Sequence, residues 1–163
     1  MQEYANQEQE VVHLFDGTEV MQYQAATRWQ RFFNLFVDNL VMQYGISYLT
    51  GAIVGYILMY AVPNFEEQLA YEDGWSWGVF WLALIIGELN YLLYYTICEK
   101  SFKGYTLGKL LTGTRAIRND GGELTFKDAF LRSLSRLVPF EAFSGFGTPW
   151  HDTWTKTTVI KAR

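Results

Sequence analysis

The chain has 163 residues, half of them apolar and 18% aromatic, and its net charge is −4 at pH 7. This length predicts one domain, and the apolar content excludes a disordered chain. The single Cys excludes a disulfide within the chain and a CxxC metal site, and the acidic balance disfavours a nucleic-acid binder. The mean hydropathy of −0.02 averages over two unlike kinds of segment.

The N-terminal segment, residues 1–27, is expected to lie in the cytoplasm and to contain a β-hairpin. Residues 11–23 read VVHLFDGTEVMQY, two β-rich runs around Asp16-Gly17. An Asp-Gly pair between apolar runs favours a tight hairpin turn. Residues 1–10 are acidic and polar and lack the pattern of a signal peptide, so the apolar segment that follows is expected to stay in the mature protein.

Two long apolar stretches predict transmembrane helices. Residues 40–62 hold 17 apolar residues of 23 and no charge, and residues 75–98 hold 18 of 24 with one charge. About 20 mostly apolar residues cross a bilayer core of roughly 30 Å. Apolar residues occur all round both helices, as lipid requires. The alternative is a soluble bundle with two buried helices, which a chain this short could hardly cover.

Small residues in the two stretches predict where the helices pack. Gly51 and Gly55 form a GxxxG step, and Gly87 is expected at a similar depth on the second helix. Such steps let helix backbones approach closely in membranes. We expect the two helices to cross there, although the same step could mark a homodimer face.

Glu88 is the one charged residue in the second stretch, and it lies near the expected bilayer midplane. A carboxylate there costs roughly 2.5–3.5 kcal/mol and needs a partner, water or a proton. Asn90 and Tyr91 are neighbours that could share its hydrogen bonds. Glu88 is either a proton- or cation-coupled site or a neutral side chain that bonds across the helix pair.

The distribution of Lys and Arg predicts the orientation. Residues 63–74, between the two stretches, hold four acids and no base, whereas residues 99–163 hold 11 bases and six acids. The positive-inside rule then places both termini and residues 99–163 in the cytoplasm, where the basic part faces anionic headgroups.

The cytoplasmic part is expected to combine β-structure with one amphipathic helix. Residues 112–125 resemble a second hairpin with its turn at 119–122, and residues 157–161, TTVIK, could pair with either hairpin. Thr125 is a natural N-cap for a helix over 126–138, which Pro139 ends. This helix is either interfacial, with Arg side chains reaching phosphates, or an ordinary solvated helix. Lys109 is expected to contact headgroups rather than a nucleotide.

Three motifs in a fixed order resemble the RDD family of bacterial membrane proteins. They are RFFNLFVD at 31–38, GYTLGKLLTGTRAIRNDGGELTFKDAFLRSLSR at 104–136, and Trp150-His151-Asp152 followed by TKTTVI. The resemblance covers roughly residues 28–160. It implies a bacterial inner-membrane protein whose name-giving Arg and two Asp are Arg31, Asp38 and Asp152, and whose suggested activity is transport or ion exchange.

These three residues are expected to form one charged cluster at the cytoplasmic membrane boundary. Arg31 and Asp38 are two helical turns apart and share a face. Asp38 lies at the edge of the hydrocarbon, where a carboxylate needs a cation, and Arg132 or Arg136 could supply it. The cluster is a structural clamp or a cation or headgroup site; alternatively, Asp152 caps a turn and Arg31 reaches phosphates.

The expected fold is a mainly α integral membrane protein with two transmembrane helices, an amphipathic helix and small cytoplasmic β-hairpins. No catalytic residue, cofactor or metal site is expected: His13 and His151 lack ligand spacing, and no nucleophile motif is present. Two spans cannot enclose a substrate path. The function is therefore expected to be transport or ion exchange by a homo-oligomer, or non-catalytic assembly within a larger membrane complex. The expected partners are lipid and protein, not nucleic acid.

Overall fold

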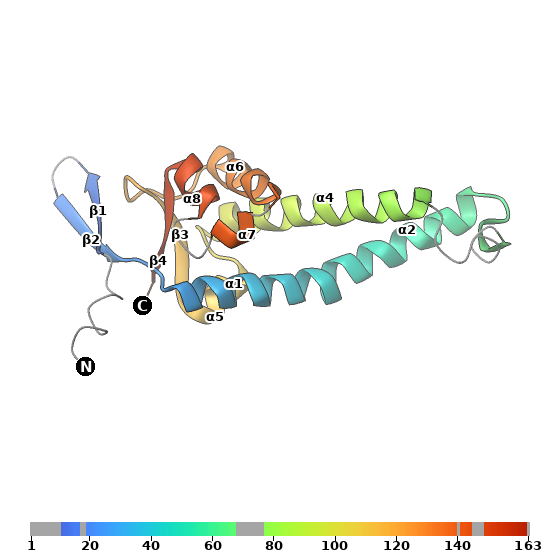
Figure 1. Cartoon of the computed structure of the whole chain (residues 1–163), viewed down its shortest axis with the longest axis horizontal. Coiled ribbons are helices and arrows are strands. Elements are labelled where there is room, and N and C mark those ends of the chain that lie inside the picture. The colour runs from blue at the N-terminus through green and yellow to red at the C-terminus, as the bar shows by residue number, and fades with distance from the viewer. Residues whose placement is uncertain (1–10, 17–18, 68–76, 140, 145–148, 163) are drawn as a thin grey trace. The chain divides into compact units, whose positions relative to one another are not determined.

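The structure is a computed structural model that describes residues 11–16, 19–67, 77–139, 141–144 and 149–162. The chain divides into two compact units. Residues 39–91 form one, here called the helical unit, and residues 1–38 with 92–163 form the other, here called the polar-core unit. Figure 1 labels the elements of both units.

The described helices include two that are long and apolar enough to cross a membrane. The first runs from Arg28 to Ala61 as α1 (Arg28–Leu40), a π-helical turn η1 (Val41–Ile46) and α2 (Ser47–Ala61). The second is α4 (Trp77–Ser101). The first helix begins before the predicted stretch at 40–62 and ends one residue short of it, at Ala61. The second runs beyond the predicted stretch at 75–98 to Ser101, and residues 75–76 lie outside the described residues.

Within the helical unit, a polar contact joins α2 to α4. The Asn90 Nδ2 atom donates to the Thr50 Oγ1 atom at 2.8 Å. The expected crossing at Gly51, Gly55 and Gly87 is wrong, because a Cβ built at any of them would meet nothing within 4 Å. A GxxxG step permits a second helix to approach the backbone closely, but it does not by itself cause a helix to pack against it.

The polar-core unit contains the described strands. Strand β1 (Val11–Asp16) pairs antiparallel with β2 (Glu19–Gln24), and the turn at 17–18 lies outside the described residues. Strand β3 (Thr114–Arg118) pairs antiparallel with β4 (Thr157–Lys161). Ala25 bridges to Ile160, which ties the segment before α1 to β4.

The second hairpin predicted over 112–125 is wrong. The turn at 119–122 is present, with Gly121 at φ +82°, but the chain then enters α6 (Phe126–Arg136) through a capping box of Thr125 and Asp128. Too few residues remain between the turn and the cap for a returning strand. The β-branched run TTVIK pairs with β3 instead, across about 40 residues of sequence.

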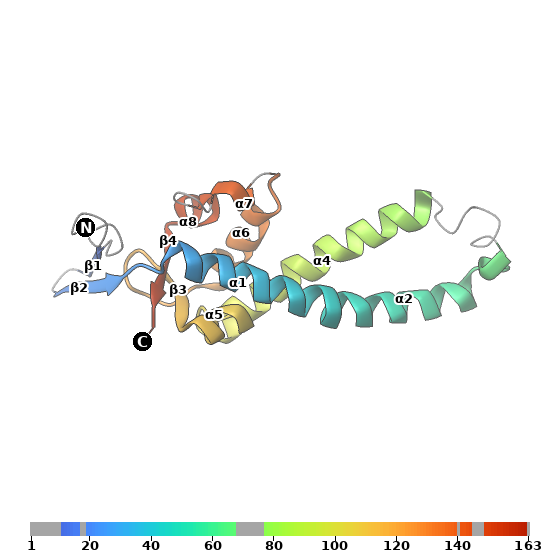
Figure 2. The ribbon, with the colours of Figure 1, turned by 60° about the horizontal axis from the view of Figure 1, so that its bottom comes forward.

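Short helices complete the polar-core unit: α5 (Leu107–Thr112), α7 (Glu141–Ser144) and α8 (Trp150–Thr155). Helix α5 lies beside α1 in both views of the ribbon (Figures 1 and 2), and α6 packs against α8. Gly108 permits the approach of α5 to α1, since a Cβ there would overlap the backbone carbonyl of Asn34.

We predict that Gly108→Ala lowers the thermal unfolding midpoint of the detergent-purified protein. Alanine favours a helix over glycine by up to about 1 kcal/mol, but at Gly108 the added methyl group must displace the backbone of α1. Gly51→Ala is the matched control, because its Cβ enters open space on a helix and should leave the midpoint unchanged or raise it. Equal midpoints for the two variants would contradict the close contact.

Candidate functional site

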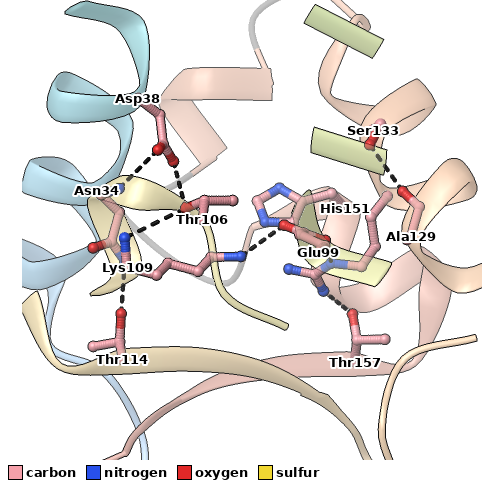
Figure 3. A network of polar contacts seen from close by, with 12 residues as sticks. Asn34, Asp38, Glu99, Thr106, Lys109, Thr114, Ala129, Ser133, His151 and Thr157 are labelled. Atoms are coloured by element: carbon pink, nitrogen blue, oxygen red, sulfur yellow. Dashed lines mark hydrogen bonds and ion pairs between the residues drawn. The ribbon is translucent and has the colours of Figure 1, made fainter. Parts of the chain in front are cut away.

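The centre of the polar-core unit is an ionised network around Glu99, at the last turn of α4. The Glu99 Oε1 atom lies 2.6 Å from Lys109 Nζ and 2.7 Å from Arg136 Nη2, and its Oε2 atom lies 2.9 Å from Arg132 Nε. The Glu99 and Arg132 side chains are fully buried. Figure 3 shows the Lys109 side chain extended toward Glu99. One carboxylate therefore holds basic groups from both α5 and α6.

Arg132 connects Glu99 to a second buried carboxylate, Asp152 on α8. Its Nη1 atom lies 2.6 Å from Asp152 Oδ1 and also donates to the Thr157 hydroxyl. The other oxygen of Asp152 lies 2.6 Å from Arg31 Nη1 on α1. The arrangement is a chain of alternating charge from α1 through α8 and α6 to α4, in which each charge has a hydrogen-bonded opposite charge.

The expected cation partner of Asp38 is wrong. Its Oδ1 atom accepts hydrogen bonds from the Tyr94 hydroxyl at 2.8 Å and the Gly108 amide at 2.8 Å, and its Oδ2 atom accepts from the Thr106 hydroxyl at 2.7 Å. Asp38 is buried. Three neutral donors therefore satisfy this carboxylate without an arginine: one from α4, and two at the N-terminus of α5, where the helix dipole favours negative charge.

The structure thus brings together four of the five residues of the predicted charged cluster and separates the fifth. Arg31, Arg132, Arg136 and Asp152 share one network with Glu99, whereas Asp38 belongs to a neighbouring set of neutral contacts. Arg31 does not extend to phosphates: it binds Asp152 and the carbonyls of Ala26 and Val159.

Two members of the network were missed by sequence reasoning. Lys109 was expected at lipid headgroups, but its side chain is only 4% exposed and pairs with Glu99. Glu99 directly follows the apolar run that ends at Cys98. Its position at the edge of the second apolar stretch, equivalent to that of Asp38 at the first, was the signal that could have identified it.

The network changes the ionisation of its members. Burial lowers the pKa of Lys109 to about 8, with Glu99 opposing this and Arg136 and Arg132 adding to it. Burial would raise the pKa of Asp152, but Arg132 and Arg31 hold it well below its usual range. The carboxylate of Asp152 is therefore ionised across the physiological range, whereas burial makes Lys109 easier to deprotonate than an exposed lysine.

A second contact pair borders the network. The His151 Nδ1 atom lies 2.5 Å from Glu141 Oε1, and His151 Nε2 lies 3.4 Å from Asp152 Oδ1. Burial, with a smaller contribution from Arg136, lowers the pKa of His151 to about 4. A neutral imidazole still carries one N–H, which Nδ1 can donate to Glu141. Among the described residues, no group of three or more His, Cys, Asp and Glu could hold a metal ion.

Glu88 lies in the helical unit, apart from these contacts. Its side chain is exposed, and it makes no hydrogen bond or ion pair with any residue that the structure describes. Its expected neighbour Asn90 instead donates to Thr50. Glu88 is thus an acidic side chain in the apolar part of a candidate span, and the described residues offer it no neutralising partner.

Two helices able to cross a membrane, joined to a unit with a charged interior, define a small helical membrane protein. The family model that matches the chain is that of the RDD family, over residues 25–156. The chain belongs to this family, as the three motifs indicated. No curated protein and no solved structure matches it.

The low pKa of His151 predicts how stability depends on pH. Between about pH 6.5 and 4 the unfolded chain binds a proton at His151 that the folded chain does not bind, so stability falls as the pH falls. The loss is at most about 3 kcal/mol. We expect the thermal midpoint of the purified protein to fall over this window, and His151→Gln to remove most of the slope. In the folded protein, Asp152 and Glu141 take up protons at lower pH than is usual for these groups. An unchanged slope in His151→Gln would contradict the assignment of the slope to His151.

Proposed function

We propose that the chain is the subunit of an oligomeric ion-exchange module in a bacterial inner membrane, with Glu88 as the exchanging carboxylate. The observation that carries the proposal is that Glu88 is exposed on an apolar helix and has no partner among the described residues. The proposal involves no catalysed reaction and no cofactor.

The energetic argument concerns the surroundings of Glu88. An ionised carboxylate facing lipid near the bilayer midplane is costly, so the side chain must be protonated, hydrated or paired with another chain. Two helices cannot enclose a polar path on their own. An oligomer that places several copies of Glu88 around one path gives each carboxylate access to water, where it can exchange a proton for a cation.

The charged network of the polar-core unit has a structural role in this proposal. Its buried carboxylates are already occupied by arginine and lysine side chains, which leaves them little capacity to bind a transported cation. The distribution of Lys and Arg along the chain supports an orientation with both termini in the cytoplasm, because the segment at 63–74 holds neither residue.

An assembly subunit of a larger membrane complex is the second candidate. It is favoured by the faces of the helical unit, where α2 has no buried residue and large aromatic side chains are exposed, among them Tyr44, Tyr48, Tyr56, Tyr60, Trp77 and Trp81. Aromatic side chains on this scale supply contact area for other helices as well as for lipid.

Proton flux in proteoliposomes distinguishes the two. We expect an inward gradient of Na⁺ or K⁺ to drive proton efflux, reported by a pH-sensitive dye, and Glu88→Gln to reduce the flux at least tenfold while abundance and oligomeric state stay unchanged. Glu67→Gln, the same change at an exposed acid outside the apolar stretches, should retain the flux.

Two outcomes would contradict ion exchange. The first is full flux in Glu88→Gln. The second is no flux from the wild-type protein with either cation, combined with a monomeric mass in detergent, which would favour the assembly role.

A further inference from the structure

The buried and exposed faces of helix α1 are inverted relative to those of a helix in a water-soluble domain. Its buried residues are the polar Asn34 and Asp38. Its exposed residues are large aromatic side chains: Trp29 is 69% exposed, and Phe32, Phe33 and Phe36 are each about half exposed. Water-soluble proteins place such side chains inside, because burial of apolar surface drives their folding.

Helix α6 shows the same inversion. Arg132 and Ser133 are fully buried, whereas Phe126, Leu131 and Leu134 are exposed. The Thr96 hydroxyl donates to Ser133, and the Ser133 hydroxyl donates to the Ala129 carbonyl within the helix, as Figure 3 shows for the latter pair. Both sequence interpretations of this helix are therefore wrong about its arginines, since Arg132 and Arg136 point neither to phosphates nor to water but to Glu99.

The two short helices follow the same rule. In α5, Gly108 and Lys109 are buried, whereas Leu111 is 75% exposed. In α8, Asp152 is buried and the indole rings of Trp150 and Trp154 stack on the outside with centroids 5.8 Å apart. Four helices of one unit thus present apolar side chains outward around a charged interior.

Among the described residues of the polar-core unit, the exposed charges lie in its turns and at the ends of its helices: Arg28 begins α1, Lys100 is in the last turn of α4 and Lys127 is in the first turn of α6. Lys103 and Glu123 form an exposed ion pair of 3.2 Å, and Arg118 pairs with Asp120 at 2.8 Å. Lys103 follows α4, Arg118 ends β3, and Asp120 and Glu123 lie between β3 and α6. The described helices of the unit therefore present apolar side chains along their length, and its exposed charges lie at turns and helix ends.

We propose that α1, α5, α6 and α8 of the polar-core unit are seated in the lipid bilayer, with acyl chains covering their apolar faces. The turns and helix ends with exposed charge then lie at the headgroups or in water. The occupant is lipid rather than a soluble partner because α1, with its exposed aromatic side chains, is the first part of a helix that is itself a candidate span. Charges in an apolar solvent must be paired within the protein, and the network around Glu99 meets that requirement.

Spin labels on single cysteines test the depth of these faces. In a Cys98→Ser background, labels at Leu111 and Leu134 in liposomes should collide with oxygen, which concentrates in acyl chains, several-fold more than with a water-soluble nickel chelate. A label at Glu123, the matched control on an exposed turn, should show the reverse preference. Leu110 and Phe130, on the same two helices and also exposed, serve as a second pair if either first variant loses helix content.

Two results would overturn the proposal. Nickel accessibility at Leu111 and Leu134 equal to that at Glu123 would place these helices in water. Immobilised spectra with low accessibility to both reagents would show that protein, a second copy or another partner, covers the faces. The readout does not involve Glu88, so it stands or fails independently of ion exchange.

Discussion

The fold of the polar-core unit depends on buried charges that are compensated by opposite charges of the protein rather than by solvent. Glu99 and Asp152 are buried carboxylates, and together they hold Arg31, Lys109, Arg132 and Arg136. These six side chains come from five helices, so none of the helices can move without leaving a charge unpaired. A buried pair contributes little net stability when it is complete, but its disruption is costly. The network therefore specifies one arrangement of helices rather than supplying the bulk of the stability.

The apolar interior is too small to do this alone. One cluster comprises Ala26, Ala116, Leu124 and Val159, and the other comprises Ile117 and Ile160 with Tyr23 beside them. Both belong to the β3–β4 pair and its surroundings, whereas the helices meet through polar groups. This division fits a membrane protein, in which contact between helices gains nothing from the hydrophobic effect and polar side chains supply the specificity.

The sequence predicted those features that depend on local composition. The apolar runs, the strand at 157–161 and the Thr125 cap could be read from residue type and spacing, whereas the link of Arg31 to Asp152 was implied by the resemblance to the RDD family. The β3–β4 pairing could not, because it joins segments far apart in the chain. The pairing of Lys109 with Glu99 and the inward-facing side of α6 could not be predicted either. Periodicity defines two faces of a helix, but which face is buried depends on whether the surroundings are water or lipid. Glu99 was overlooked because it lies just outside an apolar run.

The most direct test of the account is a double-mutant cycle on Glu99 and Lys109, with stability measured by denaturant unfolding in detergent. Glu99→Gln should cost about 3–5 kcal/mol, since it leaves three buried cations with a neutral partner. Lys109→Met alone should cost less, because two arginines still hold the carboxylate. The account predicts that the double variant is more stable than the sum of the two losses implies, by about 1–3 kcal/mol. Strictly additive losses would show that Glu99 does not hold the network together.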